Sequence, residues 1–303
     1  MKIWFDKDNT DFNNFCSEQF LLLPFFSEHV LQKDNDFKNS QKWKASIEQH
    51  ITYTTKEKCD VFLFPEKLNH KIGNYIFEAR KYNKKILAFY NDDNDKPSNL
   101  DSSVALFRTS LFKSKQKNNE YAMPAWSQDF NDIVSFKCRE KKEKPVVSFC
   151  GFFSNPIRKN CIETLKNNNQ IQTNFIIRKN FWGGSPHNQQ VRTEYVKNMI
   201  NSDFVLCARG AGNFSYRFYE ALSCGRIPIF VNTDCVLPCE NKINWRDVCM
   251  FVEQPENINK VIHTYWNNLT NEKYQKMQNT IREIYLNYIS PDGFTKYLNS
   301  LYG

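Results

Sequence analysis

Two oppositely charged residues, Arg217 and Glu220, stand three positions apart where a helix is expected to begin. The first turn of a helix attracts anions through its free backbone N–H groups and its dipole. An arginine there can grip a phosphate with two parallel hydrogen bonds. A carboxylate one turn later can accept hydrogen bonds from the vicinal hydroxyls of a ribose. The pair therefore has the spacing of a nucleotide-sugar site; the alternative is a surface ion pair worth roughly 0.2–0.5 kcal/mol.

The surrounding stretch, residues 202–245, reads as strand, polar loop, helix, strand and polar loop. The apolar run 203–207 predicts a buried strand, and Asn213 is a good N-cap for the helix that follows. Gly225 stands where a helix C-cap is expected, and 227–231 predicts a second strand. Both loops then leave the carboxyl ends of strands, where open α/β sheets bind their ligands.

This stretch resembles the exostosin family of glycosyltransferases. The positions that match the family's signature are Arg209, Gly210, Ser215, Arg217, Phe218, Glu220, Ala221, Leu222, Ile227, Pro228, Leu237, Pro238, Ile243, Asn244 and Trp245. The resemblance implies an α/β chain with the GT-B fold, in which two Rossmann-like domains with parallel sheets face a central cleft. It also implies that the second domain holds most of the nucleotide sugar and that the anomeric carbon is inverted.

The resemblance further implies which residues bind the donor. The predicted nucleotide-sugar ligands are Arg158, Arg178, Arg209, Gly210, Ser215, Tyr216, Arg217, Glu220 and Asp234. Arg217 and Arg209, with Ser215 and the helix N-terminus, are expected to stabilise the departing diphosphate. Arg158 follows a strand and a glycine, as an arginine does in exostosins; alternatively it faces solvent. His187 is the one histidine expected near the donor, beside the loop 181–184.

The first half of the chain alternates strands and helices. The expected strands are 2–5, which is an edge strand or the first strand, then 59–64, 85–90 and 104–108, with helices at 43–50 and 70–82. This β-α-β order predicts a parallel sheet. The strand 59–64 ending at Pro65, and the segment 120–124, also resemble the exostosin N-terminal half.

The charged run 137–144, ahead of Pro145, is expected to be a solvated linker between two domains; nuclear localisation is the alternative. The predicted domains are 1–140 and 145–290, and the tail from about 290 to 303 is expected to return to the first domain. In the second domain we expect strands at 146–152, 174–178 and 246–252 and helices at 157–166, 193–200, 258–266 and 272–288, besides those already given.

Inverting transfer requires a general base to deprotonate the acceptor hydroxyl. The candidates follow strands of the first domain: Asp92 and Asp93, Glu66, and Asp6. We favour Asp92 and Asp93, because exostosins often carry an acid after the matching strand; the alternative is a hydrated loop. The triplet from Asp93 to Asp95 also spells the metal-binding DxD of another transferase fold. A GT-B enzyme can act without a divalent ion, so we expect no cofactor beyond the donor substrate.

Composition restricts the partners. The 303 residues carry a net charge of +8, but Lys and Arg are scattered, so nucleic-acid binding is not expected. The ten cysteines lack zinc-site spacing, which argues against a metal and for a reducing cytosol. No apolar stretch is long enough to span a bilayer. The sequence therefore predicts a cytoplasmic protein of a bacterium or of a virus-infected host cell.

Taken together, these features predict an inverting glycosyltransferase. The donor is expected to be a UDP-sugar carrying xylose or another pentose, a hexuronic acid or a hexose, and the acceptor a hydroxyl of a glycan. Two alternatives remain at this point: a fucosyltransferase that uses GDP-fucose, and a non-catalytic nucleotide- or glycan-binding protein that keeps the fold.

Overall fold

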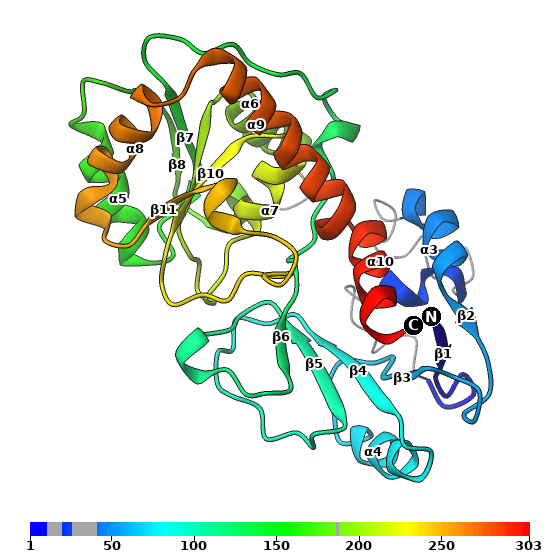
Figure 1. The fold of residues 1–303 in the computed structure, drawn as a ribbon. Coiled ribbons are helices and arrows are strands. Elements are labelled where there is room, and N and C mark those ends of the chain that lie inside the picture. The colour runs from blue at the N-terminus through cyan, green and yellow to red at the C-terminus, as the bar shows by residue number, and fades with distance from the viewer. Residues whose placement is uncertain (11–19, 26–40, 186–187) are drawn as a thin grey trace. The chain divides into compact units, whose positions relative to one another are not determined.

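The computed structural model describes residues 1–10, 20–25, 41–185 and 188–303. These residues form two compact units (Figure 1). Unit 1 comprises Met1–Gln128, Cys235–Cys239 and Leu286–Gly303, and unit 2 comprises Asp129–Asp234 and Glu240–Tyr285. The division after Gln128 falls earlier than the predicted boundary near 140–145.

Unit 1 contains a six-stranded sheet in the order β2-β1-β3-β4-β5-β6, and all its pairings are parallel. The strands are β1 (Lys2–Trp4), β2 (Thr52–Tyr53), β3 (Val61–Leu63), β4 (Lys85–Tyr90), β5 (Val104–Arg108) and β6 (Glu120–Ala122). The first strand lies inside the sheet, so the edge-strand alternative is wrong. Strand order reverses between β1 and β3, which makes their carboxyl ends the switch point of this sheet.

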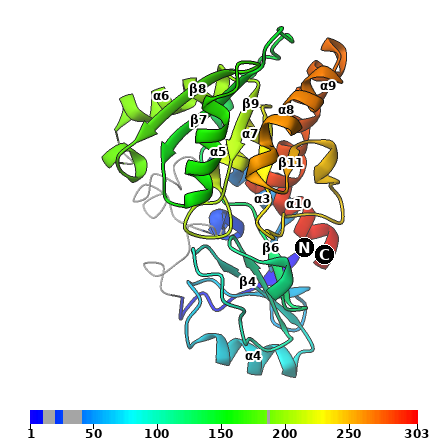
Figure 2. The same cartoon turned by 90° about the vertical axis from the view of Figure 1, so that its left-hand side faces the viewer.

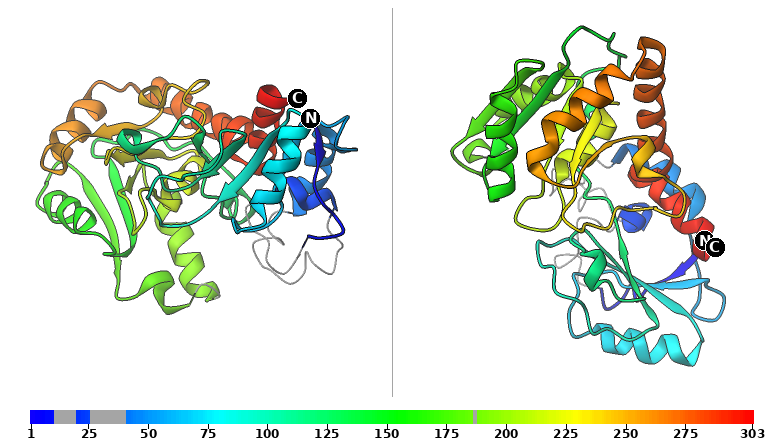
Figure 3. Two further views of the ribbon diagram at one scale, coloured as in Figure 1. Left: turned by 90° about the horizontal axis from the view of Figure 1, so that it is seen from below. Right: turned by 60° about the vertical axis from the view of Figure 1, so that its left-hand side comes forward.

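Three α-helices flank this sheet in the described part of unit 1: α3 (Lys44–His50), α4 (Ile72–Lys81) and α10 (Pro291–Tyr302). Helix α4 covers one face (Figure 2), where Tyr75 and Ala79 pack into a core with Phe62 and Phe64. Helices α3 and α10 pack against each other. The two chain ends lie side by side (Figure 3), because the Met1 amine donates to the Asn299 side chain.

Unit 2 contains a five-stranded parallel sheet in the order β11-β10-β9-β7-β8. Its strands are β7 (Val146–Phe152), β8 (Gln172–Arg178), β9 (Phe204–Cys207), β10 (Ile227–Val231) and β11 (Met250–Val252). Its α-helices are α5 (Pro156–Lys166), α6 (Gln189–Ile200), α7 (Tyr216–Ser223), α8 (Ile258–Asn267) and α9 (Asn271–Ile284). Helices α5 and α8 lie on one face of the sheet, and α6, α7 and α9 on the other (Figure 1).

The two parallel sheets confirm the predicted α/β class. Most elements lie where the sequence placed them, but β2 and β6 were not predicted as strands. Helix α6 begins at Gln189, four residues earlier than expected, because the Asn188 side chain caps it. Strand β11 is short because Trp245–Asp247 forms a 3₁₀ turn, and α9 ends in a π-helical turn, Tyr285–Ile289. No helix in the described ranges is both long and apolar enough to cross a membrane.

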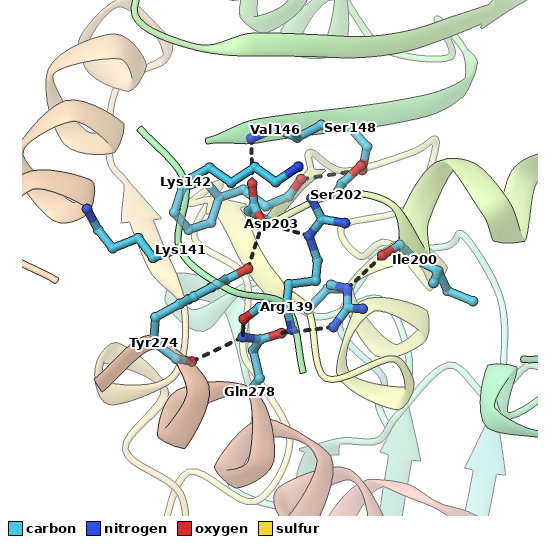
Figure 4. Close-up of polar contacts among 12 residues, drawn as sticks. Arg139, Lys141, Lys142, Val146, Ser148, Ile200, Ser202, Asp203, Tyr274 and Gln278 are labelled. Atoms are coloured by element: carbon cyan, nitrogen blue, oxygen red, sulfur yellow. Dashed lines mark hydrogen bonds and ion pairs between the residues drawn. The ribbon is translucent and has the colours of Figure 1, made fainter. Parts of the chain in front are cut away.

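The charged run 137–144 is mostly exposed, as predicted, but it lies wholly inside unit 2, so the prediction that it links the two domains is wrong. The Arg139 guanidinium donates to Asp203, with 2.7 Å between Nε and Oδ1. The Arg139 backbone exchanges hydrogen bonds with the Gln278 side chain, at 2.8 and 2.9 Å. Lys141 N–H donates to Asn271. The run therefore packs along unit 2. It is held there by the fully buried carboxylate of Asp203, which requires charged partners (Figure 4).

The same carboxylate joins the beginnings of two strands. Asp203, directly before β9, accepts from the backbone N–H of Val146 at the start of β7, with 2.7 Å to Oδ2. The Tyr274 hydroxyl donates to the other oxygen at 2.7 Å (Figure 4). Asp203 thus fixes the amino ends of β7 and β9, the two strands between which the strand order of unit 2 reverses.

We predict that Asp203→Asn destabilises unit 2 by about 3 kcal/mol, because it breaks a buried pair and leaves Arg139 without its counter-charge. The free energy of unfolding from urea titration measures this loss. Glu163→Gln is the matched control, since its pair with Lys159 is exposed (60% and 61%) and is worth less than about 1 kcal/mol. Equal losses in the two variants would contradict the role assigned to Asp203.

Candidate functional site

The carboxyl ends of β7 and β9 form the switch point of the unit 2 sheet, the place where open parallel sheets leave a crevice for a ligand. The loop after β7 leads into α5, and the loop after β9 leads into α7. The two loops are joined by a hydrogen bond from the Asn155 side chain to the Gly210 carbonyl, at 3.4 Å. Strand order therefore brings together two loops whose residues are more than fifty positions apart.

Helix α7 begins after Ser215, two residues later than the predicted start at Asn213. Asn213 instead accepts a hydrogen bond from Thr233 at 2.7 Å, which links the loops that follow β9 and β10. The helix ends at Ser223 with Cys224 as its C-cap, one residue before the predicted Gly225, whose φ of 61° is a left-handed conformation that favours glycine. The N–H groups of Gly225 and Arg226 satisfy the last carbonyls of the helix, at 3.0 and 2.9 Å.

The Arg217 guanidinium is buried in the first turn of α7, with the residue only 7% exposed. Its Nη2 donates to the Cys150 carbonyl at 2.8 Å, and its Cζ lies 4.4 Å from the centre of the Phe149 ring. Its Nε and Nη1 are buried without a hydrogen-bond partner among the described residues, as is Oγ of Ser215. Each such group costs about 1–3 kcal/mol. The oxygens of an anion would satisfy these donors, so the residues fit an anion.

Glu220 lies one turn further along α7 and is 3% exposed. Its carboxylate is held by two residues of α6: the Tyr195 hydroxyl donates to Oε2, and Nη1 of Arg192 lies 3.3 Å from Oε1. The alternative of a surface ion pair between Arg217 and Glu220 is wrong, because both side chains are buried and their hydrogen bonds go elsewhere. The helix therefore presents a buried cation and a buried carboxylate, each oriented by other elements.

Arg158, in the first turn of α5, braces the two switch-point loops. Its guanidinium donates to the carbonyls of Phe152 at 3.0 Å and Ala208 at 3.3 Å, and to the Ser154 hydroxyl at 2.8 Å. The alternative of a solvent-facing Arg158 is wrong, since the residue is 8% exposed. A Cβ on Gly210 would lie 3.3 Å from Arg158 Nη2, so this loop passes close to the guanidinium.

The other predicted donor residues lie around this centre. Arg209 donates within its own loop to the Ala211 carbonyl at 2.7 Å, and the Tyr216 ring packs edge-on against Phe214. Arg178 ends β8 and pairs with Glu194 of α6. Asp234 follows β10, is exposed and has a left-handed backbone with φ of 61°. Their predicted contacts with a donor stay predictions.

The candidate bases Asp92 and Asp93 lie in unit 1, in an exposed loop after β4. The loop is anchored by the buried Arg108, which donates to the carbonyls of Asn94 and Lys96 and pairs with Glu120 at 2.7 Å. Burial alone would raise the pKa of Glu120, but hydrogen bonds from backbone N–H groups and from Arg108 lower it below its ordinary value. Both aspartates are exposed, so the alternative of a hydrated loop stays open.

Glu66 follows β3 and is buried, in contrast to the aspartates. Lys71 Nζ lies 2.7 Å from one carboxylate oxygen, and the Asn69 amide donates to the other at 2.8 Å. Asp6 follows β1, and its N–H donates to the Tyr75 hydroxyl at 3.0 Å. The pKa of Tyr75 is raised by burial and, to a smaller extent, by the charges of Asp6 and Glu66. Glu66 and Asp6 thus flank the switch point of the unit 1 sheet.

Sequence reasoning missed two residues that shape the unit 2 site. Arg192 went unnoticed because α6 was expected to begin after it, although Asn188 is a recognisable N-cap. Gly151 was noticed only as the end of a strand. The His187 prediction, and any role of the Trp182 side chain, lie outside the described residues. Within the described residues there is no cluster of three or more His, Cys, Asp or Glu side chains suited to a metal ion.

We predict that Gly151→Ala weakens anion binding and costs some stability. A Cβ at this position would lie 2.6 Å from Arg217 Nη2, so the guanidinium must move, and the φ of 157° is one that a side chain strains. Loss of one charge-assisted hydrogen bond should raise the Kd for inorganic pyrophosphate about tenfold or more in titration calorimetry. Gly73→Ala in α4 is the control, because nothing lies within 4 Å of its Cβ. Unchanged pyrophosphate binding in Gly151→Ala would contradict an anion site at Arg217.

Comparison with known proteins gives short but recurrent matches. Exostosin-1 of Drosophila melanogaster is 38% identical over 63 residues, 21% of this chain and 8% of the fly protein. The probable beta-1,4-xylosyltransferase IRX10L of Arabidopsis thaliana is 36% identical over 64 residues, 21% and 15% of the two chains. The probable glucuronosyltransferase Os04g0398600 of Oryza sativa subsp. japonica is 36% identical over 62 residues, 20% and 15%. The matches thus span less than one sixth of these relatives.

Solved structures give longer alignments at low identity. Anabaena Alr3699/HepE, solved in complex with UDP and glucose, aligns over 99% of this chain and 98% of its own, with 10% identity and a TM-score of 0.46. WaaG, a glycosyltransferase involved in lipopolysaccharide biosynthesis, aligns over 88% and 82%, with 10% identity and a TM-score of 0.37. The model of the exostosin GT47 domain matches residues 69–267, about two thirds of the chain. The chain therefore belongs to the exostosin GT47 family.

Proposed function

We propose that the protein is an inverting glycosyltransferase that moves a sugar from a UDP-sugar to a hydroxyl of a glycan acceptor. The observation that carries the proposal is the buried Arg217, whose Nε and Nη1 meet no hydrogen-bond partner in the described ranges at the switch point of the unit 2 sheet. In a chain of the exostosin GT47 family, the ligand that suits this position is the diphosphate of a nucleotide sugar.

In this proposal four residues at the beginnings of α5 and α7 have separate tasks. Arg217 binds the diphosphate and stabilises the negative charge that grows on it as the glycosidic bond breaks. Ser215, whose buried hydroxyl lies at the N-cap of the same helix, adds a donor to the same anion. Glu220, one turn further on, accepts hydrogen bonds from the ribose. Arg158 holds the two loops in place and adds positive charge beside the diphosphate.

We propose that the donor carries xylose or another pentose, a hexuronic acid or a hexose. The names of two similar plant proteins support two of these sugars: a probable xylosyltransferase supports xylose, and a probable glucuronosyltransferase supports a hexuronic acid. We further propose that no divalent ion is required, because arginines supply the positive charge that a metal would otherwise bring to the leaving group. The cytoplasmic location stays a prediction.

We propose that the general base belongs to unit 1, with Asp93 and Asp92 ahead of Glu66. A base must reach the acceptor hydroxyl to remove its proton. Asp92 and Asp93 are exposed on a loop that Arg108 anchors, whereas Glu66 is buried and already paired with Lys71. This difference in access supports the order of preference.

The donor assignment predicts selective stabilisation by uridine nucleotides. In a thermal-shift panel of UDP, GDP, CMP and their sugars, UDP species should stabilise the wild type by roughly 2.7 kcal/mol at one hundred times their Kd. Arg217→Met, which keeps the apolar stem of the side chain, should lose this effect. Arg246→Met, in the exposed pair with Glu253, is the control and should keep it.

The panel separates the proposal from its alternatives. Stabilisation by GDP species alone would indicate a fucosyltransferase. Binding of UDP without consumption of any UDP-sugar over a panel of acceptors would indicate a non-catalytic binding protein. The absence of a response to every nucleotide would contradict the donor site.

The base assignment predicts a loss of turnover without a loss of donor binding. Asp93→Asn should lower kcat by about 10²–10⁴-fold and leave the UDP Kd unchanged, because a general base contributes that much to the rate. Asp92→Asn and Glu66→Gln test the two alternatives in the same assay. Asp95→Asn, in the same loop, is the control. Full activity in all three test variants would show that the base lies elsewhere.

A further inference from the structure

The carboxylate of Glu220 is fixed by α6 before any ligand binds. The Tyr195 hydroxyl donates to Oε2, and Arg192 Nη1 lies 3.3 Å from Oε1. The two donors stand three residues apart on α6, so they share one side of that helix. Each oxygen of this side chain, which is 3% exposed, thus has a donor on α6.

The two donors are themselves held by an aromatic cluster. The Arg192 guanidinium lies 4.6 Å from the ring centre of Phe130, which packs edge-on against the Tyr195 ring at 5.9 Å. The Phe130 N–H donates to the Ser223 hydroxyl at 3.2 Å, and that hydroxyl donates to the backbone carbonyl of Glu220 at 2.8 Å. The contacts form a closed circuit from Glu220 through α6 and back to α7, which leaves the carboxylate little freedom to rotate.

This arrangement suits a carboxylate that must receive a ligand in one orientation. A carboxylate has about four acceptor positions, and one donor on each of its two oxygens fixes its orientation. The Tyr195 ring centre also lies 6.0 Å from Cζ of Arg217, whose Nε and Nη1 have no hydrogen-bond partner among the described residues. Tyr195 therefore stands beside both ends of the ligand proposed above. Burial, together with the Glu220 charge, raises the pKa of Tyr195 well above its ordinary value, so the hydroxyl remains a donor at neutral pH.

We propose that Tyr195 and Arg192 are positioning residues that set Glu220 for the ribose hydroxyls of the donor, so that the site selects a nucleotide over a bare diphosphate. The inference rests on the function proposed above, since it assumes that Glu220 accepts from a ribose. It assigns the two ends of one ligand to different groups: the diphosphate to Arg217, and the nucleoside to a carboxylate that α6 orients. Neither α6 residue needs to touch the ligand.

Tyr195→Phe tests the inference, because it removes one hydroxyl and keeps the ring that packs against Phe130. Calorimetric titration with UDP and with inorganic pyrophosphate should show that the UDP Kd rises about tenfold while the pyrophosphate Kd changes less than about twofold. Tyr265→Phe is the matched control: it is the same change in the same unit, at a buried hydroxyl with no hydrogen-bond partner in the described part of the chain. It should alter neither Kd.

Arg192→Met provides the second variant if Tyr195→Phe does not fold, because it keeps an apolar stem over Phe130 and should change the two Kd values in the same directions. An equal rise in both Kd values, or an unchanged UDP Kd, would overturn the inference while leaving the donor site in place. If the wild type binds neither UDP nor pyrophosphate, the proposed function fails first, and the inference fails with it.

Discussion

Burial of the Arg217 guanidinium is the constraint on which the unit 2 site depends. A charged group is buried only where other groups compensate for the lost contacts with water. Arg217 donates to the Cys150 carbonyl and lies over the face of the Phe149 ring. Its Nε and Nη1 have no hydrogen-bond partner in the described part of the chain. The loops around Arg217 leave space for its side chain. At Gly151 a Cβ would collide with the guanidinium, and Arg158 holds the loops together through hydrogen bonds to Phe152, Ser154 and Ala208.

At the amino ends of β7 and β9 lies a second buried charge, the carboxylate of Asp203, and this charge has hydrogen-bond partners. Asp203 accepts hydrogen bonds from Arg139, Tyr274 and the Val146 N–H, and through Arg139 it holds the charged segment against unit 2. One end of β7 and β9 is thus fixed by a carboxylate with three donors, and near the other lies a guanidinium with two unpaired donors in the described part of the chain. This contrast is typical of proteins in which unsatisfied polar groups are concentrated at the ligand site and the rest of the scaffold is satisfied.

The two units repeat one construction with different chemistry. Each has a parallel sheet whose order reverses between its first and third strands, and each places charged residues at the carboxyl ends beside that reversal. In unit 2 these are arginines with donors that suit an anion. In unit 1 they are the carboxylates of Asp6 and of Glu66, which is buried and paired with Lys71, while Asp92 and Asp93 follow the next strand, β4, and are exposed. The residues proposed for donor binding and for proton transfer therefore belong to separate sheets.

The sequence by itself determined most strands and helices and the identity of Arg217 and Glu220, because hydrophobic periodicity, helix caps and a run of fixed residues are local signals. It could not determine the burial of those two side chains, which follows from packing α7 between the sheet and its neighbouring helices. It also could not reveal that Tyr195 and Arg192 orient Glu220, or that Asp203 orders the segment 137–144. These contacts join residues 25 to 64 positions apart, and only the parallel strand order brings them together.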